Sequence, residues 1–405
     1  PNPVDSYTYA LMINDAYRNS GGSDQFSASA LNKILKYQRG ELPYGIEQAE
    51  GQNDWAWNQR SFGNTNWYDT YLKKATVSQE HNVSLSGGGD KIIYYFSANC
   101  LGQNGLFNYA DEKYDRLTIN GKVNVKITDH INLNWNTRLV ATENDKPTAM
   151  NDLFFHNLGR RSPLSPIYMP NGEYNQESLI PAMKDGGRQN DKNQLIYNQA
   201  QFTYEPIKNW KLYLDVGSRI EAPRYTRQFN KMTYTLPDGT KKDLAVLEGV
   251  ADKSSVDPTT GSFRRQPPAG TNYYEKANGR VNFFTTNVRT DYELKRNDHY
   301  FKVLVGMQTE YYYDETTRVS SDDILLDETP FFPSSGTNVM LSDKKGEWAT
   351  VGIFGRLNYS YADRYMVEVN LRGDGASRFP SDQRWAIFPS FSAGWNIAQE
   401  PFWTP

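Results

Sequence analysis

The sequence predicts an all-β fold, an antiparallel transmembrane β-barrel of which about eleven strands are present. The first observation is a period of two in the stretch "LTINGKVNVKITDHINLNWNTRL". Apolar residues from Leu117 to Ile127 alternate with polar ones, and after a short break they alternate again from Ile131 to Leu139. Successive side chains of a strand point to opposite faces, so this stretch is a hairpin with one apolar and one polar face.

The second observation is the length of the strands. Many candidates are 10 to 14 residues long, whereas strands of globular proteins average about 5–6 residues and a tilted membrane-crossing strand needs roughly 9–11. The eleven candidates lie near 76–87, 91–101, 114–127, 130–142, 193–205, 209–221, 277–294, 298–313, 348–361, 364–376 and 385–398.

The third observation is the order of the connections. Tight turns rich in Gly, Asp and Asn, such as "SGGGDK" and "LKRNDH", alternate along the whole chain with long connections. Outer-membrane barrels have short periplasmic turns and long extracellular loops, and a sandwich has no reason to put its long loops at one end. The long connections are 102–113, 143–192, 222–276, 314–347 and 377–384.

Composition supports a barrel with a polar lumen. Aromatic residues make up 14% of the 405 residues, including 28 Tyr, while hydrophobic residues reach only 38% and the mean hydropathy is −0.74. A barrel needs few aliphatic residues because one face of each strand is polar. Several aromatic residues flank the short turns, where an interfacial girdle is expected. They are Trp210, Tyr292, Tyr300, Phe301, Tyr359, Tyr361 and Tyr365.

The N-terminal part is predicted to be the first extracellular loop. Residues 4–18 and 27–38 read as two short helices, the second with a Ser cap, and strands start near residue 76. The first strand, 76–87, leads into a short turn and therefore descends, so an ascending strand is expected before residue 1. We divide the chain into a loop region, 1–75, and barrel strands, 76–405, and expect it to be part of a larger barrel.

No pattern in the sequence indicates an enzyme or a cofactor. The four His residues are isolated from other ligand types at metal-binding spacing, and no Gly-x-Ser-x-Gly element is present. "SGGGD" lacks the Lys-Ser/Thr of a phosphate-binding loop. The net charge of −3 makes a nucleic-acid partner unexpected, and no apolar run is long enough for a transmembrane helix.

Three blocks of sequence resemble the SusC/RagA family of TonB-dependent outer-membrane transporters. The clearest is 348–402, with "GRLNYSYADRY", "RGDGASRF", "RWAIFPSFSAGW" and "EPF". The others are "NTNWYDTYLKKATVSQEHNVSLSGGGDKIIYYFSANCLGQNGLF" (64–107) and "YDRLTINGKVNVKITDHINL" (114–133). The blocks occur in the order of the family and together reach from about residue 4 to the end.

The resemblance implies a function and a set of partners. It implies a 22-stranded barrel with a plug domain, energised import through TonB by a segment outside this sequence, and a SusD-like surface lipoprotein as a lid. The substrate implied first is a large oligosaccharide, with peptides as the alternative. A surface glycan-binding β-sandwich without a channel is the alternative of a different class, and strand length, loop order and the family blocks favour the barrel.

The candidate ligand-binding residues are aromatic and lie in the predicted extracellular loops. Trp55 and Trp57 fall in the first loop, and Tyr273 and Tyr274 in "TNYYEK" (271–276). Aromatic rings can stack on the apolar faces of sugars. The other interpretation of these residues is packing within the loops or against the lid.

The block "RGDGASRF" has a structural interpretation. Arg372, Asp374 and Arg378 are expected to form salt bridges across the lumen wall rather than to contact ligand.

Overall fold

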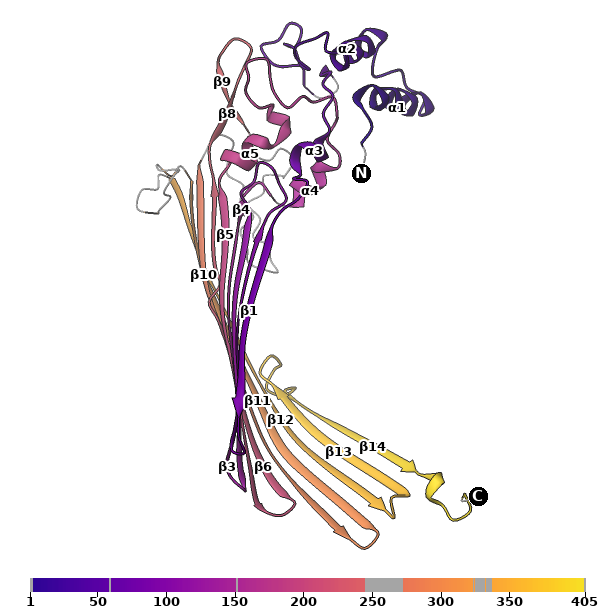
Figure 1. The fold of residues 1–405 in the computed structure, drawn as a ribbon, viewed down its shortest axis with the longest axis vertical. Helices are drawn as coiled ribbons and strands as arrows, with labels where there is room; N and C mark the ends of the chain where they lie inside the picture. The colour runs from indigo at the N-terminus through magenta and orange to yellow at the C-terminus, as the bar shows by residue number, and fades with distance from the viewer. Residues whose placement is uncertain are drawn as a thin grey trace.

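The computed structural model describes residues 3–57, 60–150, 152–244, 272–322, 324, 332 and 337–403. It consists of a long, curved antiparallel sheet with a cap of helices and loops at one end (Figure 1). No helix in these ranges is long and apolar enough to cross a membrane.

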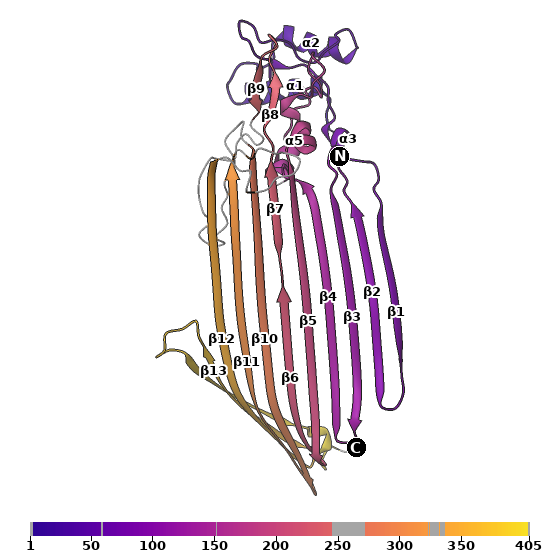
Figure 2. The same cartoon turned by 90° about the vertical axis from the view of Figure 1, so that its left-hand side faces the viewer.

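The sheet confirms the predicted antiparallel order, with eleven strand positions among the described residues. The strands lie side by side in sequence order, except that β6 is followed by β10. Figure 2 shows this order from β1 to β13. The main strands are β1 Ser78–Gly88, β2 Ile92–Asn104, β3 Lys113–Thr128, β4 Ile131–Pro147, β5 Arg188–Ile207, β6 Trp210–Glu221, β10 Tyr273–Arg296, β11 His299–Asp322, β12 Thr337–Tyr361, β13 Tyr365–Ala376 and β14 Trp385–Trp395.

One strand position is interrupted. The short strand β7 (Arg224–Phe229) follows β6 after Ala222 and Pro223, and it pairs with the same neighbours, β5 and β10. Proline has no backbone N–H, so it cannot donate to the ladder at this point. A separate hairpin of β8 (Met232–Thr235) and β9 (Lys241–Leu244) rises into the cap (Figure 1).

Strand register gathers the apolar side chains onto one face across the sheet. Val123 of β3 lies opposite Tyr94 of β2 and Trp135 of β4, and the same row continues along the sheet. Large apolar side chains on this face remain exposed, Val83 and Ile387 at 72% each. Its members include Leu85, Phe96, Leu139, Phe202, Leu214, Val216, Phe284, Val288, Val303, Val305, Met307, Ile353, Leu357, Val369, Leu371 and Phe391. Soluble monomers rarely expose such a surface, whereas membrane strands require it.

The opposite face carries polar and charged side chains. On β3 and β4, Asn124 lies opposite Asn134 and their side chains are hydrogen-bonded. Farther along the sheet, Arg289 forms an ion pair with Asp215. We call these two surfaces the apolar face and the polar face, and their separation matches the pattern predicted for a barrel wall.

The short turns lie at the end of the sheet opposite the cap (Figure 2). Asn209, Asn297 and Asp363 adopt left-handed backbone conformations there, with φ of 69°, 51° and 53°. Asn and Asp tolerate this conformation better than most residues, which is why they are frequent in tight hairpins.

The aromatic residues beside these turns divide between the two faces. Trp210 pairs with Tyr292, and the ring of Phe301 lies 4.8 Å from that of Tyr359 on the apolar face. Tyr300 alternates with Phe301 and therefore lies on the polar face, so its assignment to the girdle was wrong.

The cap contains the two predicted N-terminal helices. Helix α1 (Ser6–Asn19) begins after Asp5, which accepts hydrogen bonds from the amides of Tyr7 and Thr8. These bonds, led by the one from Thr8, lower the pKa of Asp5 to about 2. The side chain of Ser27 caps α2 (Ala28–Gln38), as the sequence predicts.

Further short helices complete the cap. They are α3 Trp67–Tyr71, α4 Asp152–Leu158, η2 Gln176–Ser178 and α5 Ile180–Asp185, while η4 Ile397–Gln399 lies near the C-terminal end. Within the first 75 residues, Trp67 and Tyr71 pack with Phe154 and Met183 in one apolar core. The first segment and the 148–187 segment thus form one structural unit.

Several strands are longer than predicted. β10, β11 and β12 contain 24, 24 and 25 residues, so much of the predicted loop 314–347 is strand. Their extensions toward the cap keep the ladder but lose the apolar alternation. On the apolar side, for example, Asn278 pairs with Thr317.

The topology predicts where an impermeant thiol reagent will react. In a Cys100→Ser background of the full-length protein, Ser23→Cys in the cap should be labelled on intact cells, and Asn297→Cys in a short turn should not. Both positions should be labelled after the cells are lysed. If Asn297→Cys is labelled on intact cells and Ser23→Cys is not, the predicted orientation, with the short turns on the periplasmic side, is wrong.

Candidate ligand-binding surfaces of the cap and the polar face

Trp55 lies in a core of the cap rather than on its surface. Its side chain is 6% exposed and packs with Ile46, Met169 and Tyr234. The indole N–H donates to the carbonyl of Thr235 at 2.9 Å. The burial favours the packing interpretation of this residue.

Trp57 lies at the edge of a polar hollow of about 740 Å³. Its indole N–H donates to Asp54 at 3.0 Å, and its ring meets that of Tyr234 edge to face at 6.0 Å. One side of the ring is thus held by the β8–β9 hairpin while the residue still lines the hollow. The other lining residues are Tyr9, Arg60, Asn157, Arg160, Arg161, Ser162, Ser165 and Glu177.

Tyr273 and Tyr274 lie in β10, so their placement in a loop was wrong. Tyr273 is fully buried, and its hydroxyl donates to Glu275 at 3.0 Å. The ring of Tyr274 lies 5.1 Å from that of Phe332. The structure therefore places these two tyrosines in packing contacts, separate from the hollow at Trp57.

Glu275 is the centre of a buried ionic cluster near the cap end of the polar face. Its carboxylate is 0% exposed and pairs with Arg227 at 2.7 Å and with Arg318. Arg227 also stacks against Phe229 and Tyr273, with its guanidinium 5.4 and 5.8 Å from their ring centres. This cluster joins β7, β10 and β11, and the sequence did not indicate it because its members are 48 and 43 residues apart.

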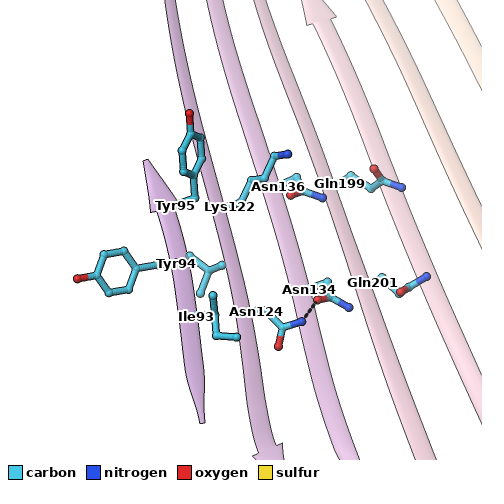
Figure 3. Close-up of a pocket in the computed structure, with 10 residues that line it drawn as sticks. Ile93, Tyr94, Tyr95, Lys122, Asn124, Asn134, Asn136, Gln199 and Gln201 are labelled. Atoms are coloured by element: carbon cyan, nitrogen blue, oxygen red, sulfur yellow. Dashed lines mark hydrogen bonds between the residues drawn. The ribbon is translucent and has the colours of Figure 1, made fainter. Parts of the chain in front are cut away.

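The polar face also carries rows of amide side chains (Figure 3). Asn124, Asn134, Asn136, Gln199 and Gln201 come from β3, β4 and β5 and line a shallow hollow of about 460 Å³. In Figure 3 Tyr95 and Lys122 lie at one end of these rows. Amides both donate and accept hydrogen bonds, so the rows can bind sugar hydroxyls or peptide groups.

The "RGDGASRF" block follows the prediction only in part. Arg372 forms the expected ion pair with Asp374 at 2.8 Å. Arg378 instead lies over the ring of Trp348 at 4.7 Å, and Trp348 stacks on Tyr312 at 5.5 Å. This aromatic pair was not among the predicted site residues.

No group of three or more potential metal ligands occurs among the residues that the structure describes.

Comparison with known proteins identifies relatives by sequence and by fold. The TonB-dependent receptor SusC of Bacteroides thetaiotaomicron is 24% identical over 364 residues, which is 84% of this chain and 33% of the relative. The TonB-dependent receptor P26 of Formosa agariphila is also 24% identical, over 84% of this chain and 32% of the relative. No family model matches the chain.

Solved structures of the RagAB peptide transporter share the fold. One aligns with a TM-score of 0.68 and 13% identity, covering 96% of this chain and 42% of that chain. Another, in a closed-closed state, aligns with a TM-score of 0.64 and 15% identity over 84% of this chain and 36% of that one. The predicted resemblance to the SusC/RagA family is confirmed.

The chain spans about a third of the length of its curated relatives. These curated relatives are named as TonB-dependent receptors, which supports the expectation of a non-enzymatic protein.

Proposed function

We propose that this chain is part of a TonB-dependent transporter that imports a large nutrient across the outer membrane. The observation that carries the proposal is the exposed apolar face, which runs across eleven strands opposite a polar face. Lipid is the solvent that such a face requires, and the polar face would then line the import path.

The cap would form the extracellular mouth. Part of the first 75 residues and the 148–187 segment share one core there, and the β8–β9 hairpin packs against Trp55 and Met169 in another. A SusD-like lipoprotein lid is the partner we propose there, on the basis of the family resemblance. TonB is the second partner that we propose, on the same basis.

An oligosaccharide is the substrate class we propose first, since Trp57 offers an aromatic ring beside polar side chains in the cap hollow. A peptide is the second candidate because the amide rows of the polar face can pair with peptide groups. Growth of a deletion strain on separate panels of glycans and peptides would distinguish them. If the deletion strain grows as well as the wild type on both panels, the import proposal is contradicted.

Trp57 is the predicted ligand residue that the structure leaves at a hollow. Trp57→Ala in the full-length transporter should weaken uptake about two- to tenfold at limiting substrate, because one aromatic contact contributes about 0.5–1.5 kcal/mol. Tyr17→Ala, which removes an exposed ring of α1 (39% exposed), is the matched control and should leave uptake unchanged.

Two measurements decide the outcome for Trp57. Barrel abundance in the outer membrane should be equal in both variants, and so should the amount of co-purified lid. If Trp57→Ala loses the lid, the ring belongs to the lid interface instead.

A further inference from the structure

The hollow at Trp57 contains a concentration of positive charge. Arg60, Arg160 and Arg161 line it together with a single carboxylate, Glu177. The Ser165 hydroxyl donates to the Glu177 carboxylate at 2.8 Å, so this carboxylate already accepts a hydrogen bond within the cap. Three guanidinium groups against one carboxylate leave a local excess of positive charge.

Arg161 is fixed in place by the fold. Its guanidinium lies 5.5 Å from the ring centre of Trp67, whose indole N–H donates to the carbonyl of Ser162 at 2.8 Å. Its Nε is buried and makes no hydrogen bond to any described residue. Burial lowers the pKa of Arg161 from its usual value, and the nearby Tyr71 and Glu177 offset this effect only in part.

The other two arginines are exposed. Arg160 is the sequence neighbour of Arg161, whereas Arg60 comes from a distant part of the chain. Arg60 follows Trp57, and its backbone N–H donates to the carbonyl of Trp57 at 3.2 Å. Arg160 has one guanidinium nitrogen 2.7 Å from Nε2 of His156, which leaves its other N–H groups available for a ligand. The cap thus brings Arg60 and Arg160, a hundred residues apart in sequence, to the same hollow.

We propose that this hollow binds the carboxylate of a transported ligand, with the arginines holding the anion and Trp57 stacking on the adjoining group. Guanidinium groups pair with carboxylates in a planar, bidentate geometry, and Asn157 and Ser162 can bind neighbouring hydroxyl or amide groups. The ligand is a uronic-acid oligosaccharide or an acidic peptide. The inference rests on the proposed import function and narrows its substrate class.

The proposal can be tested by binding to the purified full-length transporter. The probes are trigalacturonate and its neutral counterpart galactotriose, and a capped Gly-Asp-Gly peptide and its counterpart Gly-Asn-Gly. One acidic probe should bind about tenfold tighter than its neutral counterpart, since hydrogen bonds between charged groups are the strong ones. Tighter binding of trigalacturonate would identify the ligand as an acidic oligosaccharide, and tighter binding of the Gly-Asp-Gly peptide would identify it as an acidic peptide.

A double variant tests the arginines without disturbing the buried one. Arg60→Gln with Arg160→Gln should remove most of the preference for the acidic probe and reduce its dependence on salt. Arg18→Gln with Arg39→Gln removes the same charge from exposed positions of the cap outside the hollow, and should leave the preference intact.

Arg161→Lys tests the buried arginine. It keeps the charge but loses the planar guanidinium, so it should weaken binding of the acidic probe while the cap stays folded.

Three results would overturn the inference. The first is that the wild-type protein binds the acidic and neutral probes equally well. The second is that the Arg60/Arg160 variant keeps the wild-type preference for the acidic probe. The third is that this variant loses the lid partner while the small probes bind neither protein. If energised uptake of a neutral nutrient persists in these cases, the import function stands and only the carboxylate site fails.

Discussion

Val123→Arg or Leu133→Arg is expected to block assembly of the full-length barrel. Both side chains lie on the apolar face, where Val123 of β3 pairs with Trp135 and Leu133 of β4 pairs with Val125. A cation on a lipid-facing strand costs roughly 2–4 kcal/mol near the middle of the bilayer. The measurement is the fraction of protein in the outer membrane that shows heat-modifiable migration on a detergent gel.

The matched controls are neighbouring positions on the same strands. Asn124→Arg and Asn134→Arg place the same cation on the polar face, so these variants should assemble nearly as well as the wild type. Equal assembly of the apolar-face and polar-face variants would show that the apolar face does not meet lipid.

Glu275→Gln is expected to produce the second large effect, a loss of stability at the cap end of the sheet. The substitution leaves Arg227 and Arg318 without their shared carboxylate in a buried cluster. Removing one partner of a buried ion pair typically costs about 3–5 kcal/mol. The temperature at which the folded form disappears from the detergent gel should fall clearly below that of the wild type.

Glu41→Gln serves as the control for this substitution. Glu41 pairs with Arg39 at 3.9 Å and both side chains are largely exposed, so its loss should leave the transition temperature nearly unchanged. A transition for Glu275→Gln that matches this control would mean that the cluster does not stabilise the sheet.

The part of the sheet that carries the apolar face could be predicted from the sequence because it repeats one local rule. Apolar and polar side chains alternate from Leu117 to Ile127, and the pairing of β3 with β4 places the rows as expected. The short turns were equally clear, since Asn297 supplies the left-handed conformation that a tight hairpin needs.

The ends of the strands toward the cap were harder to predict for a physical reason. Beyond the apolar face both sides of these strands carry polar side chains, so the apolar alternation ends although the ladder continues. Lys276 pairs with Val319 and Asn278 with Thr317 in this region. Tyr273 and Tyr274 therefore appeared to lie in a loop.

The candidate site depended on contacts that no local pattern reveals. The stretch around Trp55 is polar, yet the indole N–H bonds to Thr235, 180 residues away. The carbonyl of Ser162, next to Arg161, is likewise joined to Trp67 across 95 residues. Aromatic residues could be identified as candidates, but which of them lie at a hollow was decided by the tertiary fold.

The most direct test of import is energised uptake of the substrate found in the growth panels. Labelled substrate would be followed in wild-type cells, in cells lacking the full-length gene, and in cells whose TonB system is disabled. We expect accumulation in the wild type only, with no more than background in the other two strains. Full accumulation without TonB would contradict the account.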